Sequence, residues 1–193
     1  MVAAAMAFAG VEETESEGIA RALRRKDSEF IGRLVARYHY RLLRYLVYVT
    51  GRRERAEDLV QETWLRVLER SGQFDGRLRF EPWLFSIARH LAIDDSRRRQ
   101  AVPESEADGE MAASDSVSPF VAAARNEDAL RVAGALGELE PIYREALLLR
   151  FQEELSLEEI GRVVGAGVST ISSRIQRGLG ILRSSMKGEN DAR

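Results

Sequence analysis

The chain has 193 residues, of which 45% are hydrophobic and 31% are charged, and these proportions argue against wholesale disorder. It contains no cysteine, which excludes disulfides, thiolate metal sites and a cysteine nucleophile. The net charge of −2 is unevenly distributed: residues 161–187 carry five basic side chains and no acid, whereas residues 101–120 carry five acids and no base. This asymmetry is typical of nucleic-acid contact beside an acidic connector.

Residues 1–26 are expected to form a flexible N-terminal tail in a cytoplasmic protein. The first eleven residues are apolar, but they lack a positively charged start and run directly into a cluster of glutamates. Such a segment is a poor signal peptide and is far too short to cross a bilayer.

Three amphipathic helices are expected within residues 27–100, where they would form a small bundle. The first helix has Asp27 or Ser28 as its N-cap and Gly51 at its end. Its apolar stripe steps by threes and fours through Ile31, Leu34, Val35, Tyr38, Leu42, Tyr45, Leu46 and Val49. The second helix has the stripe Ala56, Leu59, Val60, Thr63, Val67 and Leu68. The third helix has Pro82 in its first turn and the stripe Leu84, Ile87, Ala88 and Leu91.

Residues 101–120 interrupt this periodicity with two prolines, several serines and five acids, so they are expected to be a flexible acidic linker. Helical periodicity returns in residues 121–136 and 141–151. No strand alternation of useful length occurs. The predicted fold is therefore all-α, with two small helical bundles at residues 27–100 and 121–187 and a short tail at 188–193.

A helix-turn-helix is predicted in the second bundle. Ser156 and Glu159 form a capping-box pattern, and residues 165–167 (GAG) supply a tight turn before a second helix. In this motif the second helix enters the major groove of DNA. The side chains of that helix that lie off its apolar stripe are Thr170, Ser172, Ser173, Arg174 and Arg177. Hydroxyls and guanidiniums suit phosphate and base-edge contacts, although a plain helical hairpin with a solvated face is the alternative.

Two stretches carry a family resemblance. Residues 56–67 (AEDLVQETWLRV) and 80–94 (FEPWLFSIARHLAID) closely resemble the first conserved domain of extracytoplasmic-function (ECF) sigma factors. Residues 139–149 (LEPIYREALLL), 156–161 (SLEEIG) and 169–177 (STISSRIQR) resemble the second domain of that family. The similarity spans roughly residues 27–100 and 125–186, in the order of the family. His90, Ser172 and Gly178 depart from the asparagine, lysine and alanine that are common there.

The resemblance implies a transcription initiation factor whose first domain docks on the clamp helices of core RNA polymerase and captures the −10 element as a melted single strand. Its second domain would read the −35 element as duplex DNA. The side chains expected at the −10 strand are Arg77, Arg79, Trp83, Arg89, His90, Arg97 and Arg98. Cations interleaved with aromatic rings suit single-stranded DNA, whereas ordinary core packing is the alternative for Trp83 and Phe85.

Docking on the polymerase is expected through Asp58, Gln61 and Glu62, because their spacing places them on one helix face. The family is usually held inactive by an anti-sigma factor, so such a partner is expected. The acidic linker would enter the polymerase cleft or act only as a solvated spacer.

The same residues disfavour other functions. No nucleophile–base pair, phosphate loop or metal-ligand spacing is present, so neither catalysis nor a cofactor or metal is expected. A helix-turn-helix regulator that acts without core polymerase remains the main alternative, and a pure protein-interaction module is a second. The basic and aromatic stretch disfavours the regulator, and the basic recognition helix disfavours the module.

Overall fold

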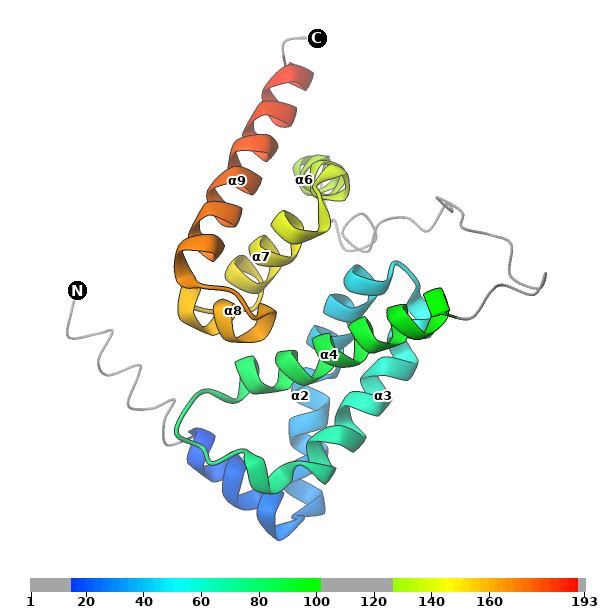
Figure 1. The fold of residues 1–193 in the computed structure, drawn as a ribbon, viewed down its shortest axis with the longest axis vertical. Helices are drawn as coiled ribbons and strands as arrows, with labels where there is room; N and C mark the ends of the chain where they lie inside the picture. The colour runs from blue at the N-terminus through cyan, green and yellow to red at the C-terminus, as the bar shows by residue number, and fades with distance from the viewer. Residues whose placement is uncertain (1–14, 102–126, 191–193) are drawn as a thin grey trace, which may run out of the picture.

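The computed structural model describes residues 15–101 and 127–190, and every regular element in these ranges is helical. The all-α prediction is confirmed. Figure 1 shows one group of helices in its lower half and a second group, α6 to α9, in its upper half. Most of the expected linker, residues 102–120, lies outside the described residues.

The first domain contains a helix at 15–25, then α2 (Ser28–Thr50), α3 (Arg53–Glu69), the short 3-10 helix η1 (Ser71–Gln73) and α4 (Phe80–Ala101). Asp27 caps α2 by accepting a hydrogen bond from the Phe30 amide at 3.1 Å. Gly51 ends α2 in the left-handed conformation. Both ends of this helix therefore lie where their capping residues predict.

The expectation of a flexible tail over residues 1–26 does not hold for residues 15–25. They form a helix whose Ile19 and Leu23 are buried against the first-domain core. The helix approaches the loop after η1 so closely that a Cβ at Gly76 would lie only 2.8 Å from the Glu17 Cα. These residues belong to the folded domain because their apolar face is needed to cover its core.

The second domain consists of α6 (Glu127–Glu138), α7 (Pro141–Phe151), α8 (Leu157–Val164) and α9 (Val168–Asn190). Since α9 continues to Asn190, residues 188–190 are helical and are not part of a tail. The predicted capping box is present: Ser156 accepts from the Glu159 amide, and the Glu159 carboxylate accepts from the Ser156 amide.

The turn between α8 and α9 depends on a close backbone approach. A Cβ at position 161 would lie 2.6 Å from the Ala166 carbonyl oxygen, so glycine is required there. Gly165 then ends α8 in the left-handed conformation, which costs glycine little. The result is a helix-turn-helix in which only residues 165–167 separate α8 from α9.

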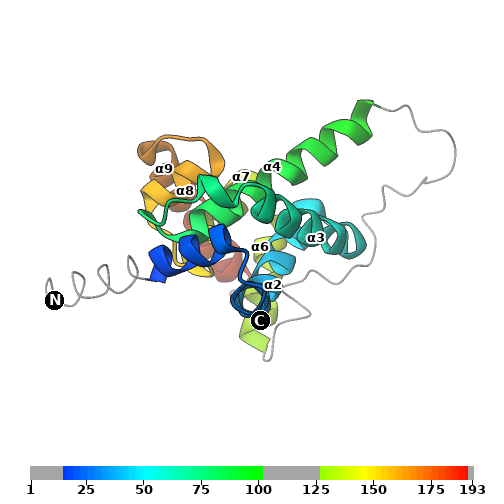
Figure 2. The ribbon, with the colours of Figure 1, turned by 90° about the horizontal axis from the view of Figure 1, so that it is seen from below.

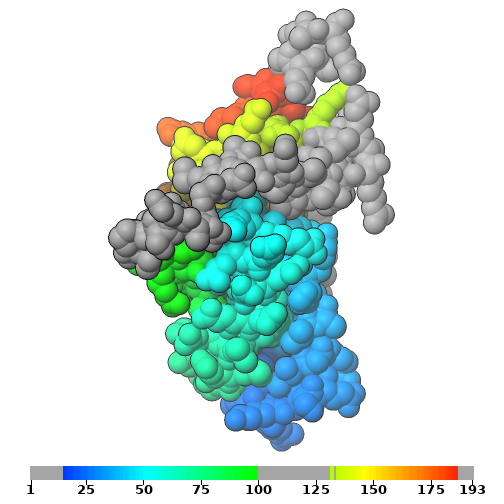
Figure 3. All heavy atoms as spheres, turned by 90° about the vertical axis from the view of Figure 1, so that its right-hand side faces the viewer, coloured from blue at the N-terminus to red at the C-terminus, as the bar shows by residue number. Residues whose placement is uncertain are grey.

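The two domains touch in the closed arrangement shown in Figure 1. Figure 3 shows the first domain below and the second domain above from another side. Helix α4 packs against α8, and α2 contacts α7. One cluster of buried apolar side chains includes members from both domains, such as Phe85 of α4 and Leu155 before α8. The C-terminal end of α4 points away from α8 and α9, as Figure 2 shows.

Candidate polymerase and nucleic-acid interfaces

Helix α3 has one buried face and one exposed polar face. Leu59, Val60 and Thr63 are almost completely buried in the first-domain core. Asp58 and Gln61 are exposed, and Glu62 is half-buried. The two carboxylates make only loose pairs within the helix: Asp58 lies 3.4 Å from Arg55 and Glu62 lies 3.7 Å from Arg66. Such surface pairs are weak, so these carboxylates are available to a partner.

An exposed leucine lies on the same face of α3 and was missed in the residue-level prediction. Leu65 is 62% exposed and follows Gln61 by four residues and Glu62 by three. That spacing places it beside them on the helix. A leucine off the apolar stripe was the sequence signal that could have identified it.

The recognition helix α9 also has one buried apolar face and one exposed polar face. Ile171 and Ile175 are buried in the second domain. Of the five side chains predicted to face DNA, Thr170, Ser173 and Arg177 are exposed, and Ser172 and Arg174 are half-buried. Arg177 also donates to the Tyr143 hydroxyl at 3.4 Å, which ties the start of the helix face to α7. The N-terminal turns of α9 therefore present hydroxyls and guanidiniums outward.

The residues expected at the −10 strand divide into two groups. Arg77, His90, Arg97 and Arg98 are exposed, and the last two occupy the end of α4 that projects from the bundle. Arg79, Trp83 and Arg89 are half-buried. The structure thus places these cations along α4 and the loop before it, but only some of them are fully exposed to solvent.

The aromatic side chains of this stretch belong mainly to the core. Phe85 is completely buried, and Trp64 of α3 is 8% exposed. Trp83 packs against Phe74 and Phe80, with ring centroids 5.2 and 5.8 Å away, but it keeps part of its surface. Core packing therefore accounts for Phe85, whereas Trp83 packs against the core and is still partly exposed.

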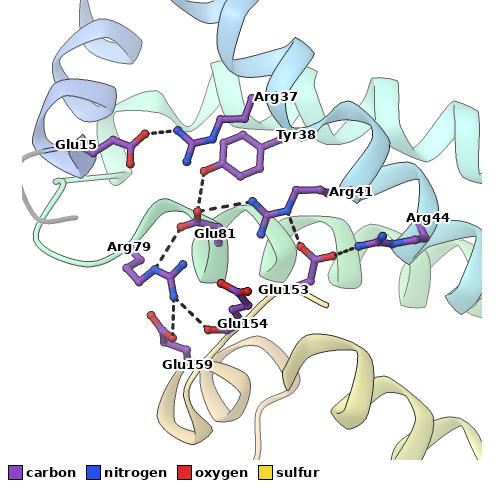
Figure 4. Close-up of polar contacts among 10 residues, drawn as sticks. All are labelled: Glu15, Arg37, Tyr38, Arg41, Arg44, Arg79, Glu81, Glu153, Glu154 and Glu159. Atoms are coloured by element: carbon purple, nitrogen blue, oxygen red, sulfur yellow. Dashed lines mark hydrogen bonds and ion pairs between the residues drawn. The ribbon is translucent and has the colours of Figure 1, made fainter. Parts of the chain in front are cut away.

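Arg79 and Arg89 both contact the second domain. The Arg89 Nε lies 2.9 Å from a carboxylate oxygen of Glu145 on α7. Arg79 donates to the Glu154 carbonyl oxygen at 3.4 Å and lies 3.6 Å from the Glu159 carboxylate, as Figure 4 shows. Sequence spacing gave no signal for these pairs, because the partners are more than fifty residues apart.

Burial controls the protonation state of Tyr45, a hydrogen-bond donor to Glu145. The Tyr45 hydroxyl donates to the same Glu145 oxygen at 2.7 Å. Burial, followed by the neighbouring Glu145 carboxylate, raises the pKa of Tyr45 well above its ordinary value. The hydroxyl therefore stays protonated at physiological pH and remains a donor to the carboxylate.

Two further observations limit the chemistry of the described residues. Within residues 15–101 and 127–190, no group of three or more histidine, aspartate or glutamate side chains is arranged to hold a metal ion. In the same ranges, no helix has the length and apolar character that crossing a membrane requires.

Comparisons with known families cover both domains. Residues 34–102 match the family described as Sigma-70 region 2, and residues 129–182 match Sigma-70, region 4. Solved structures with the same fold include CnrH in complex with the cytosolic domain of CnrY, at a TM-score of 0.63 and 22% identity over 90% of this chain and 97% of that one. The sigma factor RpoE in complex with the anti-sigma factor NepR from Bartonella quintana gives a TM-score of 0.61 at 22% identity, over 81% of this chain and 96% of that one.

Curated relatives are similar over most of their length. The ECF RNA polymerase sigma factor SigX of Bacillus subtilis is 30% identical over 78% of this chain and 80% of its own. The RNA polymerase sigma factor CarQ of Myxococcus xanthus is 35% identical over 78% of this chain and 85% of its own. The chain belongs to the ECF sigma factors of the sigma-70 family, transcription initiation factors that bind core RNA polymerase and direct it to promoters.

Proposed function

We propose that polymerase docking, −35 recognition and −10 strand capture are carried by three separate surfaces of this chain. The observation that carries the proposal is that α3 and α9 each bury one face in a core and leave a charged or hydroxyl-bearing face unused by packing. Residues on such a face do not stabilise the fold by burial. Their chemistry is therefore available to partners.

The face of α3 with Asp58, Gln61 and Glu62 is proposed to dock on the clamp helices of core polymerase. Carboxylates on a free helix face steer a basic partner and pair with its arginines in charge-assisted hydrogen bonds. Leu65 adds an apolar contact beside Gln61 and Glu62 on the same face. This combination of an exposed leucine with a polar surround is typical of a protein–protein interface.

The start of α9 is proposed to read the −35 element in the major groove. Its outward side chains are Thr170, Ser172, Ser173, Arg174 and Arg177. Arginine makes bidentate contacts to guanine, and hydroxyls bond bases or phosphates. The N-terminal position of these residues on the recognition helix matches the part that meets the bases in a helix-turn-helix.

The surface along α4 and the loop before it is proposed to capture the −10 element as a single strand. Its members are Arg77, Arg79, Trp83, Arg89, His90, Arg97 and Arg98. The arginines would track the phosphates while the exposed part of the Trp83 ring stacks on a base.

An anti-sigma factor is the proposed regulator, and the proposed location is the cytoplasm, where core polymerase acts. Two solved structures with this fold support the regulator: one is the sigma factor RpoE in complex with the anti-sigma factor NepR, and the other is CnrH in complex with the cytosolic domain of CnrY.

Reconstituted transcription tests this proposal directly. Purified core polymerase is incubated with promoter-bearing DNA, with and without this protein, and specific transcripts are measured. We expect promoter-specific initiation only when the protein is present, and co-elution of the protein with core polymerase. If the protein binds promoter duplex DNA by itself but never associates with core polymerase, the assigned docking face is contradicted. An autonomous regulator would then be favoured.

A further inference from the structure

The loop that joins η1 to α4 presents an apolar side chain between two arginines. Leu78 is 55% exposed, and it stands between Arg77 and Arg79, which both belong to the surface proposed to capture the −10 strand. The Arg77 side chain is 87% exposed. A cation suits a phosphate, and an apolar side chain suits the face of an unstacked base. A single exposed leucine is ordinary on a protein surface, and what sets this one apart is the way its loop is held.

The loop is anchored from inside the first domain by Phe74. This ring is only 3% exposed, and its centroid lies 5.3 Å from that of Phe80 and 5.2 Å from that of Trp83. Asp75 then accepts a hydrogen bond from the Arg77 amide at 2.9 Å, which closes a tight turn. The start of the loop is therefore fixed to the core.

The helix at 15–25 holds the same loop from outside. Figure 1 shows this blue helix beside the loop that leads into α4. Gly76 is buried at the contact with a φ of +82°, and a Cβ there would lie 2.8 Å from the Glu17 Cα. The Arg24 guanidinium reaches the Phe74 carbonyl oxygen at 3.5 Å. Backbone lies against backbone, so the loop has little room to move on that side.

The helix at 15–25 can support the loop because the helix is itself fixed. Ile19, Ala20 and Leu23 are at most 2% exposed and belong to the hydrophobic core. The helix ends before residue 34, where the match to Sigma-70 region 2 begins, whereas the loop lies within the match. The loop is thus supported by a segment outside the matched region.

A fixed loop matters more for choosing between bases than for attracting phosphates. A guanidinium on a long side chain can follow a phosphate even when its backbone shifts. Recognition of one particular base requires contacting groups that stay in place, since a surface that rearranges accommodates several bases equally well. The support of the loop should therefore affect base preference in particular.

We propose that the helix at 15–25 determines base preference in the −10 strand, because it holds residues 74–79 in the one conformation that sets Arg77 and Leu78 against the strand. This inference rests on the proposed capture of the −10 element as a single strand. It deepens that proposal by assigning part of the choice of base to a segment that does not itself contact the strand. Gly76 and Arg24 are positioning residues, since they act through the loop.

Gly76→Ala is the variant that separates the loop from the helix. The added Cβ would meet the Glu17 backbone, and the left-handed φ strains alanine. Gly72→Ala is the matched control, because it makes the same change in the same connection with no atom within 4 Å of the added Cβ.

Arg24→Gln is a second variant that tests the same support at an exposed position. It removes the guanidinium that reaches the Phe74 carbonyl oxygen and leaves the buried face of the helix unchanged. Arg25→Gln is its control, since it removes the same charge from the next exposed position.

Base preference is measured with each variant assembled with core polymerase, on one promoter that is active in the reconstituted assay. Every position of its −10 element is changed in turn to each of the other three bases, and transcription is compared with that from the unaltered promoter. We expect Gly76→Ala to reduce the preference at one position by about tenfold, and to leave the others within about twofold, because a single base commonly carries discrimination of that size. Arg24→Gln should shift the same position by a smaller factor, and Leu78→Ala should also act there. Both controls should reproduce the profile of the unmodified protein.

A folded Gly76→Ala protein with the base preferences of the unmodified protein would overturn the inference. An equal loss of transcription on every template would do so as well, because it would show that the helix only stabilises the fold. If Gly76→Ala does not fold by circular dichroism, Arg24→Gln decides between the same outcomes.

Failure of the strand-capture proposal gives a different result. Replacing the exposed Arg97 and Arg98 by alanine would then leave promoter opening unchanged, whatever the base preferences of Gly76→Ala. If these arginines are needed for opening and Gly76→Ala keeps the original base preferences, strand capture stands and only the role of the helix at 15–25 is wrong.

Discussion

Arg55 of α3 holds the buried carboxylate of Asp95 on α4. The Arg55 Nε lies 2.9 Å from one Asp95 oxygen, and a second guanidinium nitrogen bonds to the other oxygen. Arg99 lies 3.5 Å from the same carboxylate. This bidentate pair ties the helix of the proposed docking face to the helix of the proposed strand surface. The two faces therefore keep a fixed relationship to each other.

The Arg55–Asp95 pair should make the stability of the first domain depend on pH. The hydrogen bond from Arg55 lowers the pKa of Asp95 below its ordinary value of 3.8. The stabilisation is therefore complete above about pH 4 and is lost as the pH falls through the lowered pKa of the folded state. Asp95→Asn should reduce the unfolding free energy by about 1–2 kcal/mol at pH 7 and by progressively less below pH 4.

Urea unfolding followed by tryptophan fluorescence measures this effect, because both tryptophans lie in the first domain. Asp94→Asn is the matched control, since Asp94 is adjacent to Asp95 in the chain and its own carboxylate is exposed. A loss of stability from Asp95→Asn that stays the same at pH 7 and pH 3 would show that the ion pair is not its cause.

The recognition helix gives the second prediction. Arg174→Ala and Arg177→Ala should each weaken binding to −35 duplex by roughly 1–3 kcal/mol if the side chains touch bases. If they touch only phosphates, the loss should be independent of sequence, and the salt dependence should fall by about 0.9 in slope per contact. Arg183→Ala, two turns further along α9, is the control. Unchanged duplex affinity and promoter activity in the double variant would remove these arginines from the interface.

Strand capture gives the third prediction. Arg97→Ala combined with Arg98→Ala should impair promoter opening and leave polymerase association intact, because both side chains are exposed and make no contribution to the core. Permanganate reactivity of thymines in the −10 region measures opening. Arg21→Ala with Arg25→Ala removes an equal charge from an exposed part of the helix at 15–25. Normal opening by the folded α4 variant would contradict the assignment.

The docking face gives the fourth prediction. Asp58→Lys with Glu62→Lys replaces attraction by repulsion and leaves the buried stripe of α3 unchanged. We expect a protein that is folded by circular dichroism, does not co-elute with core polymerase and does not initiate transcription. Glu29→Lys with Glu138→Lys makes the same change in net charge at exposed positions elsewhere. Near-normal polymerase affinity in the α3 variant would mean that docking uses another face.

Features that depend on near neighbours in the chain were determined by the sequence alone. The cap at Asp27, the end of α2 at Gly51 and the capping box of Ser156 and Glu159 all lie where their residue types predict. The exposed faces of α3 and α9 follow equally from helical periodicity. A helix brings residues three and four apart together wherever the helix lies, so these features need no knowledge of the rest of the fold.

Features that depend on contacts between distant segments were decided only by the tertiary structure. The helix at 15–25 looks like a polar tail until the core that buries Ile19 and Leu23 is present. Arg89 looks like a free cation until the second domain places Glu145 beside it. These two residues are 56 positions apart in the chain, and no local sequence pattern predicts that they form a pair. They pair because burial of apolar side chains between the two domains brings them together, and charges that are partly removed from water need a partner.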